Sequence, residues 1–388
     1  MTIQPIVALW QDRDSNVIMD KKITEDEAKQ TPPKRKFLVG VNNAWFCNRY
    51  ANDIGYNQYS DGRLWHRPYT DDISHIDFSK SDPNPPRPLI SETPELLELY
   101  FRSISGLDIV RIWLFERLEG LCFDENQNVI SIDNEFLINL KKILDTADSY
   151  NVKVYFCLFD SWAVKYDPPS ELPKSRIPSY RVWNSTVTQI MKSIVEYPEW
   201  FINNVLNPLV EKLRDHPAIY GIDIMNEPEG MFKFNKIVSE SSMRNYIRSC
   251  SIAIKQRLKT SVGCMRVKTA KSYSSLPIDF CDIHLYNKRA RVDRYVSNKY
   301  NNKTCIIGEC GYPVTLDFYG RRNNEVKTAE KFLTKSFQNG YSACLVWDHD
   351  FTSKENKRRL TDWLKEVVRT KNYTEWGPFT ESSVGSTK

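Results

Sequence analysis

The chain has 388 residues, of which 41% are hydrophobic and 12% aromatic, so it is long and apolar enough to bury a full core rather than stay disordered. Its 54 basic and 49 acidic residues are interspersed, which argues against a surface that binds nucleic acid. No stretch approaches the roughly 20 apolar residues that cross a bilayer, and the first residues lack the basic start of a signal peptide. We therefore expect no membrane association and a cytoplasmic location, or secretion if a signal has been removed.

From Phe37 onward, short apolar runs alternate with longer amphipathic segments, which is typical of repeated βα units around a parallel sheet. Most of the short runs are continuously apolar, as expected of strands that are covered on both faces. Strands are predicted to begin at Phe37, Ile109, Val152, Ile219, Ser261, Phe280, Thr304 and Tyr341. Apolar residues at helical spacing predict helices that begin at Thr93, Asn134, Glu199 and Lys327.

This alternation predicts an α/β fold, namely a (β/α)₈ TIM barrel over residues 37–372. The structural alternative is a doubly wound parallel sheet, but no Gly-x-Gly-x-x-Gly turn follows the first strand, so dinucleotide binding loses its main support. Residues 1–36 are predicted to form a lead-in packed on the barrel, and residues 373–388 a polar C-terminal tail.

Two connections are too long to be simple turns: Phe46 to Leu89 after the first strand, and Asp160 to Glu196 after the third. Both leave the carboxyl end of a strand, where barrel enzymes place their sites. Both are rich in aromatic residues, whose flat apolar rings suit the CH-rich faces of sugars as well as ordinary loop packing.

The nine cysteines form no Cys-x-x-Cys pair, and the five histidines show no His-x-x-x-His spacing. We therefore predict neither a metal nor another cofactor. Since free cysteine behaves as a small hydrophobe, cysteines inside apolar strands are predicted to be buried free thiols. These are Cys157, Cys281, Cys305 and Cys344.

Two carboxylates, Glu227 and Glu309, follow apolar runs at the ends of the fourth and seventh predicted strands. A charge there lies at the mouth of the barrel or is buried at a cost of several kcal/mol, and the strand end favours the mouth. Glycoside hydrolysis with retention needs two carboxyl groups about 5–5.5 Å apart, and these two strands lie on opposite arcs of a barrel. A Glu-Pro pair alone would be explained equally by a helix N-terminal charge or a salt bridge in a loop.

The triplet Asn226-Glu227-Pro228 closes the fourth strand and Glu309 closes the seventh. This pattern resembles the clan A glycoside hydrolases, and most closely the family 5 cellulases and mannanases, over most of the chain from Phe37. The resemblance implies that Glu227 is the acid/base and Glu309 the nucleophile of a retaining mechanism. Because the acid must be protonated while the nucleophile is ionised, we expect Glu227 to have the raised pKa of the two.

Further positions match the same resemblance. Arg111 on the second strand and Tyr286 on the sixth are expected to hydrogen-bond Glu309 and keep it ionised. Asn226 is expected to bind the sugar 2-hydroxyl. His284 precedes Tyr286 by two residues, so both can point to the same side, and it resembles the histidine that contacts substrate or the acid/base. A packed strand histidine is the alternative.

The first sugar subsite departs from the family pattern. Trp347 on the eighth strand resembles the tryptophan that forms its floor, with a core tryptophan as the alternative. Many members end the third strand in a histidine that reaches the sugar, whereas here Phe159, Asp160 and Trp162 stand there. We therefore expect an altered subsite that includes Asp160 and Trp162, and cellulase or mannanase specificity does not transfer directly. Further candidates from position alone are Asn42, Asn43, Trp45, Asp348 and Asp350.

The predicted function is that of a retaining glycoside hydrolase that cleaves a β-linked gluco- or manno-type oligo- or polysaccharide by double displacement. Whether it acts at chain ends or inside the chain stays open. The alternative is a catalytically inactive carbohydrate-binding barrel, against which the retention of all four residues Glu227, Glu309, Arg111 and Tyr286 argues. A metal-dependent hydrolase or an aldolase would need a His-x-His on the first strand or a Lys at a strand end, and neither is present.

Overall fold

The computed structural model describes residues 37–44, 53–59, 88–164, 185–255, 257–287, 290–311, 325–347 and 360–371. The predictions for residues 1–36 and 373–388 lie outside these ranges. Lys36–Thr374 form one compact unit, and everything below concerns this unit. Within the described part of the chain, no helix has the length and apolarity needed to cross a bilayer.

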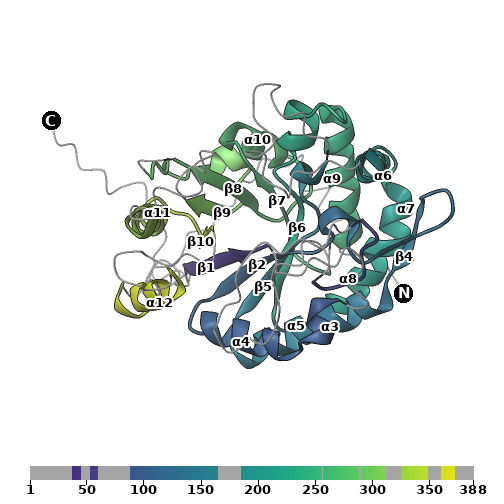
Figure 1. The fold of residues 1–388 in the computed structure, drawn as a ribbon. Helices are drawn as coiled ribbons and strands as arrows, with labels where there is room; N and C mark the ends of the chain where they lie inside the picture. The colour runs from purple at the N-terminus through teal and green to yellow at the C-terminus, as the bar shows by residue number, and fades with distance from the viewer. Residues whose placement is uncertain are drawn as a thin grey trace, which may run out of the picture. The chain divides into compact units, whose positions relative to one another are not determined.

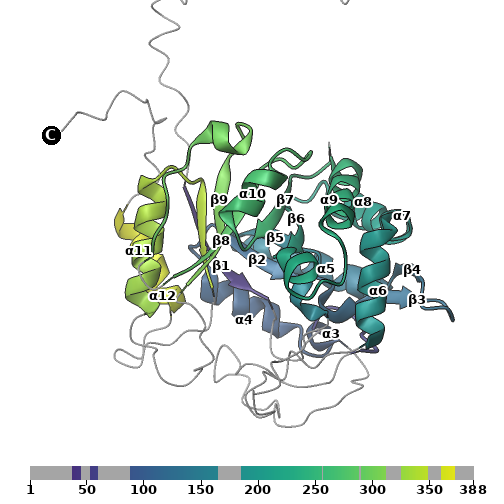
Figure 2. The ribbon, with the colours of Figure 1, turned by 90° about the horizontal axis from the view of Figure 1, so that it is seen from above.

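Eight parallel strands close into a barrel, with hydrogen-bonded neighbours in the order β1-β10-β9-β8-β7-β6-β5-β2. Every predicted strand is present, and the predicted (β/α)₈ barrel is confirmed. Figure 1 shows these strands at the centre of the unit with the helices outside them, and Figure 2 shows the same arrangement from above. The strands are β1 (Leu38–Asn43), β2 (Ile109–Trp113), β5 (Lys153–Cys157), β6 (Ile219–Asn226), β7 (Thr260–Cys264), β8 (Cys281–Tyr286), β9 (Cys305–Gly311) and β10 (Ala343–Val346).

The predicted helices are also confirmed, with small differences at their ends. The segment predicted to begin at Glu199 consists of α7, a π-helical turn η6 and α8. The helices outside the barrel are α3 (Leu89–Glu92), α4 (Glu95–Ile104), α5 (Asn134–Ser149), α6 (Ser185–Glu196), α7 (Pro198–Phe201), η6 (Ile202–Leu206), α8 (Asn207–Leu213), α9 (Glu240–Ile254), α10 (Val267–Tyr273), α11 (Glu325–Gln338) and α12 (Leu360–Lys371).

Several elements were not predicted individually, and two of them, α6 and a hairpin, lie in connections between the barrel strands. The end of the connection from Asp160 to Glu196 is helix α6, whose buried residues Val187, Ile190, Met191 and Ile194 recur at helical spacing, so the prediction of a loop up to Glu196 is wrong. The antiparallel hairpin of β3 (Leu121–Phe123) and β4 (Val129–Ile132) is too short for its periodicity to be recognised in the sequence.

Alternate residues of each strand face two different cores. In β1, Val39 and Val41 pack with the helix side chains, whereas Leu38 packs inside the barrel. The interior cluster fills the barrel with large apolar and aromatic residues, so it is a packed core and not a pore. Its buried members are Ile109, Tyr155, Phe280, Ile306, Ala343 and Leu345. The four cysteines predicted to be buried thiols, Cys157, Cys281, Cys305 and Cys344, are buried and free.

Candidate active site

Charged side chains follow the apolar interior layer toward the carboxyl ends of the strands. Arg111 is two residues beyond Ile109 on β2, and Asp282 is two residues beyond Phe280 on β8, so each continues the inward-facing row of its strand. Both Arg111 and Asp282 are completely buried. The barrel therefore changes from an apolar to an ionic interior within one step along the strands.

One extra residue in β9 turns Glu309 toward this ionic layer. Ile307 pairs with Ile283 of β8, but the next pair joins Glu309 to His284, which leaves Gly308 as the additional residue. The register with β10 also shifts over this stretch. A bulge of this kind breaks the strict alternation of a strand and redirects a side chain.

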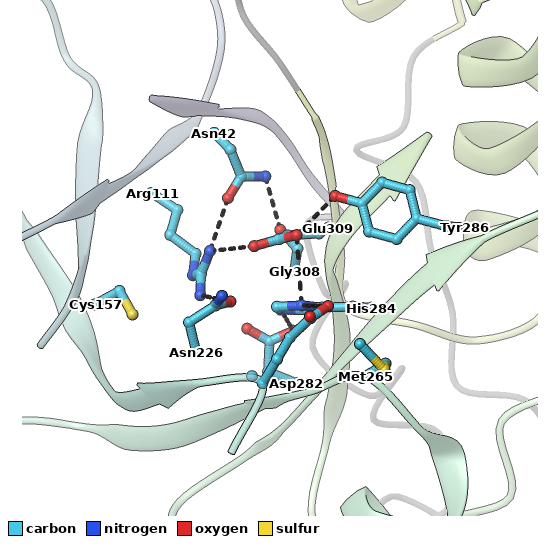
Figure 3. Close-up of polar contacts among 12 residues, drawn as sticks. Asn42, Arg111, Cys157, Asn226, Met265, Asp282, His284, Tyr286, Gly308 and Glu309 are labelled. Carbon is cyan, nitrogen blue, oxygen red and sulfur yellow. Dashed lines mark hydrogen bonds and ion pairs between the residues drawn. The ribbon is translucent and has the colours of Figure 1, made fainter. Parts of the chain in front are cut away.

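Arg111 links four strands at the centre of the site, as Figure 3 shows. Its Nη1 donates to Glu309 Oε1 over 2.6 Å and to Asn42 Oδ1 over 3.1 Å. Its Nη2 donates to Asp223 Oδ2 over 2.6 Å and to Asn226 Oδ1 over 2.9 Å. The rigid fork of donors on a guanidinium suits such a divergent set of acceptors.

Tyr286 donates from its phenol to Glu309 Oε2 over 2.7 Å, as Figure 3 also shows. Each oxygen of the Glu309 carboxylate therefore accepts a hydrogen bond from one of the two predicted partners, Arg111 and Tyr286. Burial raises the pKa of Tyr286 well above its usual value, so the phenol keeps its proton and remains a donor.

The backbone at Glu227 is strained. Its φ is +44°, in the left-handed region that non-glycine residues seldom adopt. Its N–H donates to the Gly263 carbonyl over 2.6 Å, and its carbonyl accepts from Gly230 N over 2.8 Å and from the Ser161 hydroxyl. Strain held by such a network is a frequent feature of functional sites.

The Glu227 side chain contacts two of the other predicted residues. Trp162 Nε1 donates to Glu227 Oε2 over 2.7 Å, and His284 Nδ1 lies 3.0 Å from Glu227 Oε1. The same Nδ1 lies 3.5 Å from Glu309 Oε2. The structure therefore brings the two predicted catalytic carboxylates to the same ring nitrogen of His284.

The pKa of Glu227 differs from the sequence-based prediction. Burial acts to raise it, but the hydrogen bond and charge of His284, the indole N–H of Trp162 and the charge of Arg111 outweigh burial and lower this pKa. Burial acts to lower the pKa of His284, but the charge of Glu309, the hydrogen bond to Glu227 and the charge of Asp282 raise it to about 9. The prediction of a raised pKa at Glu227 is wrong for this arrangement, because the hydrogen bonds and charges around Glu227 favour its ionised form.

Asp160 lies beside the triplet. It ends the strand-like run after β5, its Oδ1 accepts from Asn226 Nδ2 over 2.8 Å, and only 8% of its surface is exposed. With Arg111 on the amide oxygen and Asp160 on the amide nitrogen, the orientation of the Asn226 side chain is determined. Burial raises the pKa of Asp160 to about 7, although the Asn226 amide and the Trp162 backbone N–H oppose this shift.

Comparison with known proteins agrees with this geometry. No family model matches the chain. A mannan endo-1,4-beta-mannosidase of Mytilus edulis is 28% identical over 373 residues, which cover 85% of this chain and 88% of the relative. The X-ray structure of a beta-mannanase from the same mussel has a TM-score of 0.58 at 18% identity and covers 88% of this chain and 95% of its own. A beta-1,4-mannanase from the sea hare Aplysia kurodai has a TM-score of 0.58 at 18% identity, with coverages of 89% and 96%.

The structural matches support the barrel fold, and the sequence relative extends over almost the whole of both chains. Two Glu residues at the ends of β6 and β9 stand where the resemblance of the sequence requires them. The chain resembles the clan A glycoside hydrolases of the family 5 type. It is a retaining enzyme that hydrolyses O-glycosidic bonds of a β-linked carbohydrate. Nothing in these comparisons supports the alternative of an inactive carbohydrate-binding barrel.

The remaining predicted positions of this glycoside hydrolase lie near the carboxyl ends of the barrel strands or outside the described residues. Trp347 follows β10, is partly exposed and packs against Trp113 with ring centroids 5.7 Å apart. Asn42, rather than Asn43, contacts Arg111. Asn43 is buried on the helix-facing side by the alternation of β1, so its placement does not support a substrate contact. Trp45, Asp348 and Asp350 lie outside the described residues.

Three residues of the glycoside hydrolase site were missed in the sequence. Asp223 anchors Arg111 through Nη2 and Nε, Asp282 lies behind His284, and Trp113 packs on Trp347. The signal for the two carboxylates was present, because an Asp in the middle of an apolar strand of a barrel must face a cation or a donor inside it. No comparable signal in the sequence marked Trp113, since aromatic residues are common in strands.

Glu227, His284 and Glu309 offer ligand atoms that lie within 4.8 Å of one another, close enough to surround a metal ion. The contacts of these three residues favour a network of hydrogen bonds and charges over the binding of a metal. Metal ligands must be deprotonated, whereas the pKa of His284 is raised to about 9 and its Nδ1 faces two carboxylates. The absence of a metal cofactor stays a prediction.

Proposed function

We propose that this glycoside hydrolase is an endo-acting β-1,4-mannanase in which Glu309 is the nucleophile and Glu227 the acid/base. The observation that supports the roles most directly is the position of His284 Nδ1, 3.0 Å from Glu227 and 3.5 Å from Glu309. Mannan as substrate and internal cleavage are supported by the activity of the 28% identical relative, a mannan endo-1,4-beta-mannosidase.

The separation of the two carboxylates supports the retaining mechanism. One ligand oxygen of Glu227 and one of Glu309 lie within 4.8 Å of each other. Retaining enzymes have their carboxyl groups about 5–5.5 Å apart, whereas inverting enzymes need roughly 6.5–9.5 Å to admit a water molecule between them. Glu309 is therefore close enough to attack the anomeric carbon of a sugar whose leaving oxygen is at Glu227.

In the first step, a Glu309 oxygen forms a bond to the anomeric carbon while the glycosidic C–O bond breaks. The leaving oxygen takes a proton from Glu227. Arg111 and Tyr286 hold one Glu309 oxygen each, which fixes the carboxylate for attack. In the second step, Glu227 removes a proton from water, the water oxygen attacks the anomeric carbon, and the bond to Glu309 breaks.

Asn226 is placed to read the sugar next to this bond. Its Oδ1 is engaged by Arg111 and its Nδ2 by Asp160, so the second proton of Nδ2 is the donor left for the substrate. A hydrogen bond from this proton to the 2-hydroxyl would strengthen in the transition state. Asp160 thus takes part in the subsite through Asn226, in the place where many relatives have a histidine.

The experiment that tests the proposal compares wild type with Glu309→Ala on mannan, carboxymethyl cellulose and xylan. We expect wild type to cleave mannan and to lower its viscosity well before many reducing ends appear, as internal cleavage requires. Glu309→Ala should lose about 10⁴-fold or more in turnover, equivalent to about 5.5 kcal/mol. Azide should restore cleavage of an activated aryl glycoside and give a glycosyl azide of inverted configuration.

Three outcomes would contradict separate parts of the proposal. Preference for cellulose or xylan would refute the substrate, and parallel changes in viscosity and reducing ends would refute internal cleavage. Wild-type turnover in Glu309→Ala would refute the nucleophile. Asp145→Asn changes an exposed carboxylate on α5 and serves as the control for nonspecific loss of charge.

A further inference from the structure

Behind the predicted acid/base, Asp282 and His284 face each other inside the barrel. They are two residues apart on β8, so both side chains point inward. His284 Nε2 lies 3.9 Å from Asp282 Oδ1, and both residues are buried. Within the described ranges, neither of these two atoms has a hydrogen-bond partner. The two atoms therefore interact mainly through charge.

The neighbouring strands leave space for this pair. A Cβ added at Gly308 of β9 would overlap the Asp282 carboxylate, and one added at Gly263 of β7 would lie 2.7 Å from His284 Nε2. Tyr155 of β5 donates its phenol proton to the other Asp282 oxygen over 3.0 Å. The backbone at Gly308 and the Tyr155 phenol thus enclose the carboxylate, and the backbone at Gly263 lies against the imidazole.

A carboxylate at this depth requires a cation. The effective cost of burying an unpaired ion is several kcal/mol, even after the protein relaxes. Arg111 already makes short hydrogen bonds to Asp223 and Glu309, at 2.6 Å each. His284 is the imidazole placed to complement Asp282, and it carries a positive charge only when both ring nitrogens are protonated.

We propose that Asp282 is a positioning residue that holds a protonated His284 against Glu227, so that the Glu227–His284 pair stores the proton for the leaving group. This inference rests on the proposed role of Glu227 as acid/base. In this role Asp282 contacts no substrate. It controls whether the Glu227–His284 pair holds a proton for the leaving group.

The proposed step conserves protons. The proton on His284 Nδ1 moves to Glu227 Oε1, and Glu227 then gives it to the leaving oxygen as the glycosidic bond breaks and the bond to Glu309 forms. His284 stays neutral with its remaining proton on Nε2, toward Asp282. In the second step Glu227 takes a proton from the attacking water and returns it to Nδ1. Asp282 thus favours the tautomer that can accept at Nδ1.

The ionisable groups around His284 come from several strands. Glu227 and Asp223 of β6 and Glu309 of β9 are the other carboxylates, and Arg111 of β2 is the neighbouring cation. Burial raises the pKa of Asp282 to about 6, so Asp282 is ionised at neutral pH. A carboxylate within about 4–6 Å raises the pKa of a cationic partner by roughly 1–3 units. Removal of the Asp282 charge should therefore lower the pH at which the pair loses its proton.

The first test is NMR titration of the histidine ring nitrogens in wild type, Asp282→Asn and the control Asp145→Asn. Asp145 is the matched control because it lies 3.2 Å from His216 Nε2 on the surface. A His284→Gln sample assigns the signals among the five histidines. In wild type we expect both His284 nitrogens to be protonated at pH 7. In Asp282→Asn the titration should move down by about 1 to 3 pH units, and in Asp145→Asn it should not move.

The second test is the pH dependence of kcat/KM on mannan. The basic limb reports loss of the proton from the Glu227–His284 pair, so it should shift to lower pH in Asp282→Asn and stay in place in Asp145→Asn. A merely structural role would lower activity at all pH values without moving the limb. A neutral His284 in wild type at pH 7 overturns the proposal even if Asp282→Asn fails to fold.

The two hypotheses fail separately. If His284 titrates lower in Asp282→Asn but wild type cleaves no polysaccharide, the proposed function fails and the pairing stands. If wild type cleaves mannan and neither the titration nor the basic limb moves in Asp282→Asn, the pairing fails and the proposed function stands.

Discussion

Arg111 and Glu309 form a buried ion pair across the barrel, with Arg111 Nη1 only 2.6 Å from Glu309 Oε1. The side chain of Arg111 is completely inaccessible and that of Glu309 is 5% exposed. The pair joins β2 to β9, which are not neighbours in the barrel. It therefore connects two strands that the sheet itself does not pair.

Replacement of Arg111 by Met should destabilise the protein strongly. The change leaves Asp223 and Glu309 as uncompensated buried charges, and breaking a buried pair in this way costs about 3–5 kcal/mol. The measurement is the free energy of unfolding by urea. The control is Arg214→Met, whose partner Glu211 is exposed at the surface, and it should cost about 0–1 kcal/mol. Equal losses in the two variants would show that the Arg111 pairs contribute no more than surface ones.

Replacement of Glu227 by Gln should affect substrates according to their leaving groups. A general acid contributes about 10²–10⁴-fold when the leaving oxygen needs a proton, and little when it does not. We expect mannan hydrolysis to fall by this factor while the first step on an activated aryl glycoside changes much less. Steady-state rates on both substrates, with burst kinetics on the aryl glycoside, provide the measurement. Equal losses on both substrates would remove Glu227 from the acid role.

A methyl group at Gly308 should disturb the ionic layer. The added Cβ would overlap the carboxylate of Asp282, whereas at Gly311, three residues along the same strand, it would meet Tyr286 at 3.4 Å, an ordinary contact. We expect Gly308→Ala to lower the unfolding free energy by about 1–3 kcal/mol, the usual cost of overpacking, and Gly311→Ala to cost less than about 1 kcal/mol. Chemical denaturation of the two variants compares them, and a larger loss at Gly311 would contradict the geometry of the bulge.

The stability of the Asp160→Asn variant should depend on pH in a defined direction. The pKa of Asp160 is raised from its usual 3.8 to about 7 in the fold. Between these pH values the folded protein therefore binds more protons than the unfolded protein. The stability that this proton binding contributes is lost as pH rises toward 7. Asparagine does not ionise, so the melting temperature of the variant relative to wild type should rise between pH 4 and pH 7, by roughly a few degrees.

The matched control for Asp160 is Asp124→Asn. Asp124 is partly exposed in the turn between β3 and β4, and hydrogen bonds from the side chain and the backbone N–H of Asn128 lower its pKa. The melting temperature of Asp124→Asn relative to wild type should not rise between pH 4 and pH 7. If Asp160→Asn follows the same course as Asp124→Asn, then Asp160 is not held in its protonated form by burial.

Local features of the sequence determined the barrel strands and the main candidate residues of the site. Apolar runs of strand length and amphipathic segments of helix length recur along the chain, and this periodicity depends only on neighbouring residues, so all eight barrel strands could be predicted. Glu227 and Glu309 could be identified because a charge directly after an apolar strand has few acceptable positions in a barrel. The contacts of Arg111 and Tyr286 with Glu309 were implied by the resemblance to the clan A glycoside hydrolases, and both are present.

Tertiary structure decided the rest, because it depends on distances across the barrel that no local pattern records. Gly308 adds a residue to β9 and turns Glu309 inward, and the bulge exists only in relation to the strands on either side. The lowered pKa of Glu227 arises because His284, which lies two strands further along the chain, comes within 3.0 Å of it and is itself surrounded by carboxylates. Charges act through space, so the protonation of this site is a property of the closed barrel and not of any segment.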